Sequence, residues 1–302
     1  MSFNLSNFWQ PKDFWVDYFE KEGTSMPLLI TNGIIALICL IGIVFNASIV
    51  YVTAKTESLH GRCNLLIAFN SLTVIPLLIG TSYKFFILLF KINLVPLSHC
   101  YRIFIIGLIG GGLCTSAQLC VGVDRLLSVL FPIWYRTSSN ASFYLLIALC
   151  FIRSVYLNVF YVYAVYLWPE KPVMCSCDDI VQPEIRAFIY HEGLALFCAE
   201  FFCYATMWRL FSCRRSQGNL NTRTTRLLLK SLTTIMCVSF VCYIQGILCR
   251  LLLSYFNVDQ LQIEFYVNFP TNLLFTIAFS SNAPILYMFS GEYRRAFKSH
   301  FF

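Results

Sequence analysis

Long apolar runs, separated by short polar segments, dominate the chain. A helix needs about 20 mainly apolar residues to cross the hydrocarbon core of a bilayer. Seven runs reach that length: residues 26–53, 65–90, 100–123, 143–168, 186–210, 227–255 and 263–289. The second and seventh runs contain prolines, which membrane helices tolerate. The pattern predicts an all-α membrane protein built as a bundle of seven transmembrane helices.

Composition agrees with this prediction. Of 302 residues, 58% are hydrophobic and only 12% are charged, whereas a soluble domain carries about 25% charged residues. The net charge of +7 does not indicate nucleic acid, because basic residues in a membrane protein mark the cytoplasmic side. No catalytic constellation, phosphate loop or metal motif stands out. We therefore expect contact with membrane lipid, no nucleic-acid partner, no enzymatic activity and no cofactor or metal.

Lysines and arginines set the expected orientation. With the N-terminus outside, the inner segments carry more basic residues than the outer ones, so the rule for basic loops favours an outer N-terminus and an inner C-terminus. Asn4 then lies in a glycosylation sequon on the outer tail. We expect a multi-pass plasma-membrane protein with an extracellular tail (residues 1–25), a seven-helix domain (26–289) and a cytoplasmic tail (290–302).

That last segment reads GEYRRAFKSHFF from Gly291. At helical spacing, Tyr293, Ala296 and Phe297 share one apolar face and basic residues occupy the other. Such a pattern is typical of a short helix that lies in the membrane interface. The sequence therefore predicts an amphipathic cytoplasmic helix after the seventh span.

An acid and a base stand together where the third run ends, in LCVGVDRLLSVLFPIWYR (residues 119–136). Inside a core this pair, Asp124 and Arg125, would be costly to desolvate, whereas at the membrane surface the cost is low. Cys100 begins the same run, 25 positions before Arg125. At the end of the seventh run, SNAPILYMFSGEYRRAF holds Asn282, Pro284 and Tyr287.

These motifs resemble those of the rhodopsin-like G-protein-coupled receptors over almost the whole chain. CNLLIAFNSL, KSLTTIMCVSFVCY, NAPILY and EYRRAF are most similar to the nematode serpentine chemoreceptors. The resemblance implies a chemosensory receptor that binds an extracellular small molecule or peptide and activates a heterotrimeric G protein. It implies an activation switch formed by Asp124, Arg125, Tyr204, Tyr243, Asn282, Pro284 and Tyr287.

Departures from the family pattern matter for the mechanism. Leu126 replaces the tyrosine of the Asp-Arg-Tyr motif, and Val74 stands where the family's sodium-site aspartate would fall. The inner end of the sixth run has no acid, so we expect Asp124 to be the main restraint on Arg125. Asn46 resembles the asparagine of the family's first helix.

The resemblance also implies a disulfide from Cys100 to the loop that follows the fourth run. The outer face of a membrane is oxidising, which permits such a bond. Cys175 and Cys177 are both candidates, with a slight preference for Cys177.

Ionisable residues in the outer halves of spans are candidate ligand contacts. They are Lys84, His191, Glu192 and Arg250, although each has the alternative of reaching the interface as a helix-end charge. The two bases would suit an acidic ligand group. Gly107 and Gly111 either enlarge the pocket or permit close helix packing. Arg153 and Glu200 lie nearer the middle of their helices. A buried pair or a water site would suit these two residues, but no spacing in the sequence indicates that they meet.

Two other functions remain in competition with the receptor. A seven-helix channel or transporter is disfavoured because the sequence shows no inverted repeat and few mid-membrane charges. A receptor-like membrane protein that does not signal is the other alternative.

Overall fold

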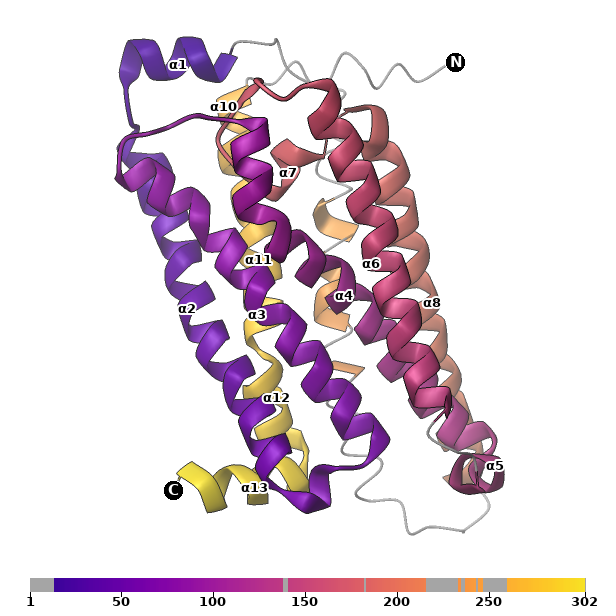
Figure 1. The fold of residues 1–302 in the computed structure, drawn as a ribbon. Coiled ribbons are helices and arrows are strands. Elements are labelled where there is room, and N and C mark those ends of the chain that lie inside the picture. Colours follow the sequence, from indigo (N-terminus) through magenta and orange to yellow (C-terminus); the bar gives the residue numbers. More distant parts are fainter. Residues whose placement is uncertain are drawn as a thin grey trace.

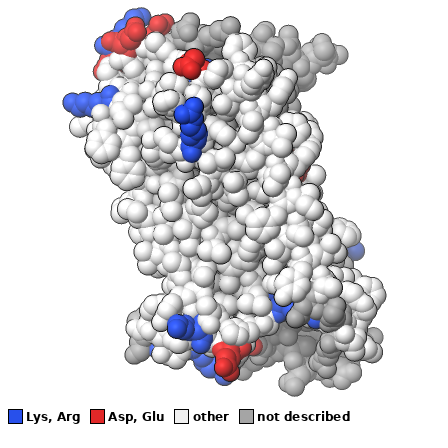
Figure 2. Space-filling model, viewed as in Figure 1, with Lys and Arg blue, Asp and Glu red and all other residues white. Residues whose placement is uncertain are grey.

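The computed structural model describes residues 14–137, 141–181, 183–215, 233–234, 237–242, 244–246 and 260–301. Its long helices lie side by side in an elongated bundle, with the short helix α1 at one end and α13 across the other (Figure 1). Charged side chains gather toward the two ends of the visible face, and the middle of that face is nearly uncharged (Figure 2). An apolar waist between two charged ends suits a membrane environment.

The first half of the chain forms the long helices that the apolar runs predict. Its α4 is longer than run 100–123 at both ends, because the segment around Asp124 and Arg125 continues the helix instead of ending it. The bounds are α1 Phe14–Glu22, α2 Met26–Lys55, η2 Glu57–Leu59, α3 Arg62–Leu89, α4 Leu97–Leu130, α5 Pro132–Thr137 and α6 Ala141–Leu167.

Four helices, α2, α3, α4 and α6, are long and apolar enough to cross a membrane. A fifth candidate is the bent pair Leu261–Ser280 and Asn282–Phe289, whose two parts meet at 45°. The described residues therefore contain four or five apolar spans. Most of run 227–255 lies outside the described residues.

Two short strands tie the connections at one end of the bundle together. Strand β1 (Val95–Pro96) precedes α4, and β2 (Pro172–Val173) follows α6; they pair antiparallel, with Val95 opposite Val173. The chain then forms α7 (Cys177–Ile180) and the long helix α8 (Pro183–Arg215). This pairing holds the segment after β2 over the start of α4.

The last part of the chain is a broken helix followed by a crossing one. It comprises α10 (Gln260–Ile263), the π-helical segment η3 (Glu264–Asn268), α11 (Phe269–Ser280), α12 (Asn282–Phe289) and α13 (Gly291–Phe301). Helix α13 buries Tyr293, Ala296 and Phe297, which are the three residues of the expected apolar face.

Glycines allow α2, α3, α4 and α11 to approach closely. A Cβ on Gly42 would lie 2.1 Å from Ser280 Oγ, and one on Gly110 would lie 2.7 Å from the Thr73 carbonyl oxygen. Both distances are below any tolerable contact, so larger side chains at these positions would force the helices apart.

Candidate ligand cavity and activation switch

A cavity of about 210 Å³ lies among α2, α3, α4 and α11. Its wall is mostly apolar and includes the rings of Phe104, Phe275 and Phe279. Of the twelve described residues that line it, Lys84 alone carries an ionisable side chain. A largely apolar hollow with few polar groups is the usual form of a small-molecule site.

Lys84 is held by a carboxylate that lies 180 positions away in the sequence. Its ammonium donates to Glu264 Oε1, and both side chains are buried, at 8% and 9% exposure. Asn268 Nδ2 donates to the other carboxylate oxygen at 2.8 Å. Glu264 and Asn268 both belong to the π-helical segment η3, a local distortion that is frequent at functional sites. The ion pair therefore joins α3 to the start of the last helix.

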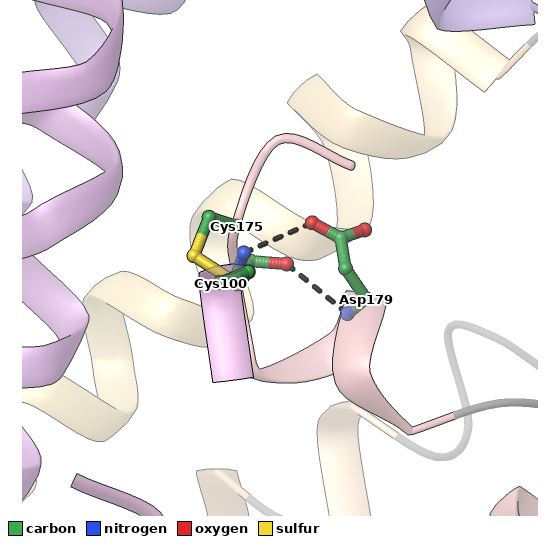
Figure 3. Close-up of a disulfide and its surroundings, with 4 residues drawn as sticks. Cys100, Cys175 and Asp179 are labelled. Carbon is green, nitrogen blue, oxygen red and sulfur yellow. Dashed lines mark hydrogen bonds between the residues drawn. A yellow bond between two sulfur atoms is a disulfide. The ribbon is translucent and has the colours of Figure 1, made fainter. Parts of the chain in front are cut away.

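A disulfide fixes the loop beside the cavity (Figure 3). It joins Cys100, in the first turn of α4, to Cys175, with a Cα–Cα distance of 5.3 Å. The slight preference for Cys177 is wrong, because Cys177 begins α7 two positions further on. Ser176 follows the disulfide directly and lines the cavity, so the covalent bond positions part of the cavity wall.

Ser176 and Asp179 form a reciprocal cap on α7 (Figure 3). The Ser176 amide donates to Asp179 Oδ2 at 2.9 Å, and the Asp179 amide donates to Ser176 Oγ at 3.3 Å. Burial raises the pKa of the Asp179 carboxyl, against the opposing charge of Lys84. The cap makes the segment after Cys175 a compact turn instead of an extended loop.

The two candidate glycines lie at a helix contact. A Cβ on Gly107 would meet the Pro76 carbonyl oxygen at 3.2 Å and the Gly80 Cα at 3.4 Å, and one on Gly111 would meet the Leu77 side chain at 3.3 Å. Neither glycine is among the described residues that line the cavity. Close packing of α4 on α3 is therefore their role here, not enlargement of the pocket.

Glu192 takes part in a second ion pair, between α8 and α6. Its carboxylate accepts from Arg153 Nε at 2.5 Å and from Arg153 Nη2 at 2.8 Å. Arg153 Nη1 also donates to the Gly112 carbonyl oxygen and to the Thr115 hydroxyl, both at 2.7 Å. Arg153 thus joins α4, α6 and α8, and its carboxylate partner is Glu192, not Glu200.

The remaining ligand and switch candidates are distributed as follows. His191 is exposed on α8 and does not line the cavity. Arg250, Tyr243 and the sequon residue Asn4 lie outside the described residues.

At the opposite end of α4, Asp124 is bound by a tyrosine. The Tyr135 hydroxyl, on the short helix α5, donates to both carboxylate oxygens of Asp124 at 3.0 Å. The Arg62 guanidinium lies over the Tyr135 ring, 5.3 Å from its centroid, in cation–π geometry. Burial, together with the neighbouring Asp124 charge, raises the pKa of the Tyr135 phenol. The phenol therefore stays protonated and remains a donor at neutral pH.

Arg125 is not paired with Asp124 in this structure. It is absent from the two ion pairs described above, Lys84–Glu264 and Arg153–Glu192. Arg125 lies near the Cys63 thiol on α3, and its Nε is buried without a partner. The expectation that Asp124 directly restrains Arg125 is corrected, because the carboxylate of Asp124 is occupied by Tyr135.

Two asparagines connect the first and last long helices. Asn282 Nδ2 donates to Asn46 Oδ1 at 3.2 Å, and Asn46 Nδ2 donates to the carbonyl oxygens of Gly42 at 2.8 Å and Phe279 at 3.0 Å. Asn282 opens α12, directly after the 45° bend. The network therefore provides a hydrogen-bond donor for the Phe279 carbonyl group beside the bend and fixes the direction of α12.

The residues after the bend lead to α13. Pro284 lies in the first turn of α12, where a missing amide proton costs little. The ring of Tyr287 meets that of Phe297 on α13 edge to face, with centroids 6.2 Å apart. The motif thus couples the end of the bundle to the crossing helix.

A second, smaller cavity of about 30 Å³ lies between the ligand cavity and the Asp124 end. Its wall includes Gln118, Glu200 and Tyr204, all buried. Both polar atoms of Gln118 are buried without a hydrogen-bond partner. This polar layer was not predicted as a unit, although carboxyl and amide side chains in the middle of apolar runs were the signal that could have found it.

The fold and these sites define a multi-pass α-helical membrane protein, with a disulfide-anchored cavity toward one end of its third long helix and an Asp-Arg pair toward the other. A family model described as the serpentine type 7TM GPCR chemoreceptor Srsx matches residues 39–301. The chain belongs to that family, whose members are receptors and not enzymes.

A mammalian relative belongs to the same broad class. Over 214 aligned residues, the chain is 28% identical to the Mas-related G-protein coupled receptor member A4 of Mus musculus. The alignment covers 70% of this chain and 64% of the mouse protein, so it spans somewhat less than two thirds of that relative.

Proposed function

We propose that this receptor is a chemosensory protein of the plasma membrane that binds an extracellular small molecule or peptide and activates a heterotrimeric G protein. In this proposal seven helices span the membrane, the N-terminal tail (residues 1–25) is outside, the receptor domain covers residues 26–289, and the tail (290–302) is cytoplasmic. One observation carries it: α4 holds the disulfide beside the ligand cavity in its first turn and carries Asp124 and Arg125 toward its other end.

Signalling requires two conformations that the ligand binds with different affinity. In the resting form the Tyr135 hydroxyl bonds hold Asp124 and keep α5 against α4. Arg125 lies against α3 near Cys63. When the ligand favours the second form, the cytoplasmic helix ends separate and the permanently charged guanidinium, with five donors, becomes accessible to the G protein.

The Asn46–Asn282 network and Tyr287 are the second part of the switch. They connect α2, the bend before α12 and the crossing helix α13. A change in the α11–α12 bend would reach α13 through the Tyr287–Phe297 contact. We assign Pro284 the role of fixing the first turn of α12 in this movement, and Tyr204 that of a buried contact on α8.

A reporter cell that expresses the receptor tests the proposal. We expect Arg125→Ala to abolish G-protein signalling at normal surface expression. Arg102→Ala is the matched control, because Arg102 is an exposed arginine on the same helix at the opposite end. Equal signalling by the Arg125→Ala variant would contradict the proposal, and a ligand-evoked current that persists without G proteins would favour a channel.

Topology has a cheaper test. An epitope tag placed before Phe14 should bind antibody on intact cells, and a tag after Phe302 should bind only after permeabilisation. A cytosolic N-terminal tag would contradict the proposed orientation.

A further inference from the structure

The one ionisable group in the described wall of the cavity is already paired with a carboxylate before any ligand binds, and the buried Asp179 carboxyl lies near the same pair. Lys84 is the one ionisable residue among its described lining, and Glu264, which is not part of that lining, already neutralises it. Asn268 donates to the second oxygen of the same carboxylate. Lys84 thus belongs to a closed, buried pair, not to a cationic pocket.

A charged ligand group would disturb the Lys84–Glu264 ion pair. A carboxylate beside Lys84 would place two carboxylates on one lysine in a site poor in water, and like charges so placed repel strongly. An ammonium group would meet the Lys84 ammonium. Either ion would also lose its hydration without gaining an unshared partner. The arrangement argues against the acidic ligand that the two outer bases suggest from sequence alone.

Three of the five uncharged polar residues in the wall, Asn32, Thr81 and Thr276, offer acceptors that suit a hydrogen-bond donor on the ligand. Thr81 Oγ1 donates to the Leu77 carbonyl oxygen at 2.9 Å, and Thr276 Oγ1 donates to the Asn272 carbonyl oxygen at 2.7 Å. Asn32 Nδ2 donates to the Leu28 carbonyl oxygen at 2.8 Å. Since these donors are engaged with their own helices, the side-chain oxygens of Asn32, Thr81 and Thr276 face a ligand mainly as acceptors.

The volume of the cavity narrows the class of ligand further. Sites for drug-sized ligands measure about 300–1,000 Å³, and the cavity measures about 210 Å³. The rings of Phe104, Phe275 and Phe279 form an apolar part of the wall against which the carbon skeleton of a ligand can lie. The cavity therefore suits a small molecule better than a peptide.

We propose that the cavity binds a small uncharged molecule with a hydroxyl group on an apolar or aromatic body, and that it discriminates against carboxylates and amines of the same skeleton. This inference rests on the proposed receptor function, because it identifies the ligand class of the same cavity. The hydroxyl donates to the threonine and asparagine acceptors, and the apolar body lies against the phenylalanine rings.

Two matched sets of probes test this: benzyl alcohol, benzoate and benzylamine, and 1-hexanol, hexanoate and hexylamine. The full-length receptor in lipid nanodiscs is heated with each probe, and the rise in Tm with concentration gives an apparent Kd. We expect at least one alcohol to bind at least tenfold more tightly than both charged members of its set. A charged member that binds as well as its alcohol, or the absence of a Tm rise with both alcohols, would overturn the inference.

Variants separate the cavity from general effects of alcohols on lipid. Leu77→Trp fills the cavity and should abolish the alcohol-dependent Tm rise; a rise that persists would overturn the inference. Glu264→Gln removes the carboxylate that is hydrogen-bonded to Lys84, so the preference should move at least tenfold toward benzoate. The exposed Glu57→Gln is its control and should leave the preference unchanged.

A double variant covers the case in which Glu264→Gln does not fold. Lys84→Met with Glu264→Met replaces the pair by apolar side chains of similar size, which proteins often tolerate. It should retain the alcohol preference and gain no benzoate binding.

The binding of the probes is measured without a G protein, so the ligand class and the G-protein coupling are tested separately. Alcohol binding without G-protein activation would refute the proposed coupling alone. Activation by the charged probes would refute the ligand class alone.

Discussion

At the scale of single residues, the sequence identifies candidate functional side chains but not the residues that they contact. Asp124 and Arg125 are adjacent in the chain, yet the carboxylate binds Tyr135, eleven positions on. Helix geometry explains this: neighbours in a helix point in different directions, while the turn into α5 brings the phenol back under α4. Likewise, Lys84 and Glu264 could not be paired from sequence, because their contact depends on how the first and last halves of the bundle meet.

The Asp124–Tyr135 contact leads to a prediction about basal signalling. Asp124→Asn and Tyr135→Phe each weaken the bonds that hold α5 on α4, so each should raise basal G-protein signalling at equal surface expression. Because both variants break the same interaction, the double variant should rise no further than the larger single effect. Tyr144→Phe, at an exposed tyrosine on α6, is the control. Unchanged basal activity in both single variants would contradict this role.

At the scale of elements, hydrophobic pattern predicts helices well and their interruptions poorly. Runs 26–53, 65–90 and 143–168 agree closely with α2, α3 and α6, because about 20 apolar residues leave few alternatives. In run 263–289, Pro284 is a local signal for a kink near the 45° bend, but nothing local indicates the π-helical η3. That distortion accompanies the contact of Glu264 with Lys84 on α3, which no local pattern contains.

The asparagine network stabilises the bend before α12, and its contribution to the stability of the receptor can be measured. Asn46→Ala removes the two donated bonds and the one accepted from Asn282. A buried bond contributes about 1 kcal/mol, and an orphaned partner costs about 1–3 kcal/mol. Asn46→Ala should thus destabilise the receptor by roughly 2–4 kcal/mol in thermal unfolding. Asn158→Ala, which loses one bond within its own helix, should cost clearly less; equal losses would count against the network.

At the scale of the whole molecule, the chain is organised around α4. One end of α4 carries the disulfide and its other end carries the Asp-Arg pair, and its glycines allow α3 to lie close along it. Family resemblance indicated a disulfide from Cys100, but not which of two nearby cysteines it joins. That choice is made by the β1–β2 pairing and the α7 cap, which together place Cys175 over the first turn of α4.

The disulfide gives a matched pair of variants. Cys175→Ala opens a covalent loop that spans 75 positions, which corresponds to about 4 kcal/mol in the chain-entropy treatment. We expect a marked fall in Tm and in surface expression. Cys177→Ala should leave both nearly unchanged. The opposite result, with Cys177→Ala the damaging variant, would show that the loop is anchored through Cys177.

In the proposed mechanism, α4 transmits ligand binding to a G protein through Arg125. The most direct measurement is nucleotide exchange by purified heterotrimeric G proteins mixed with the receptor in nanodiscs, compared among wild type, Arg102→Ala and Arg125→Ala at equal amounts of folded protein. We expect wild type and Arg102→Ala to accelerate exchange on at least one G protein and Arg125→Ala not to do so. Equal acceleration by Arg125→Ala, or no acceleration by wild type on any G-protein class with and without the alcohol probes, would contradict it.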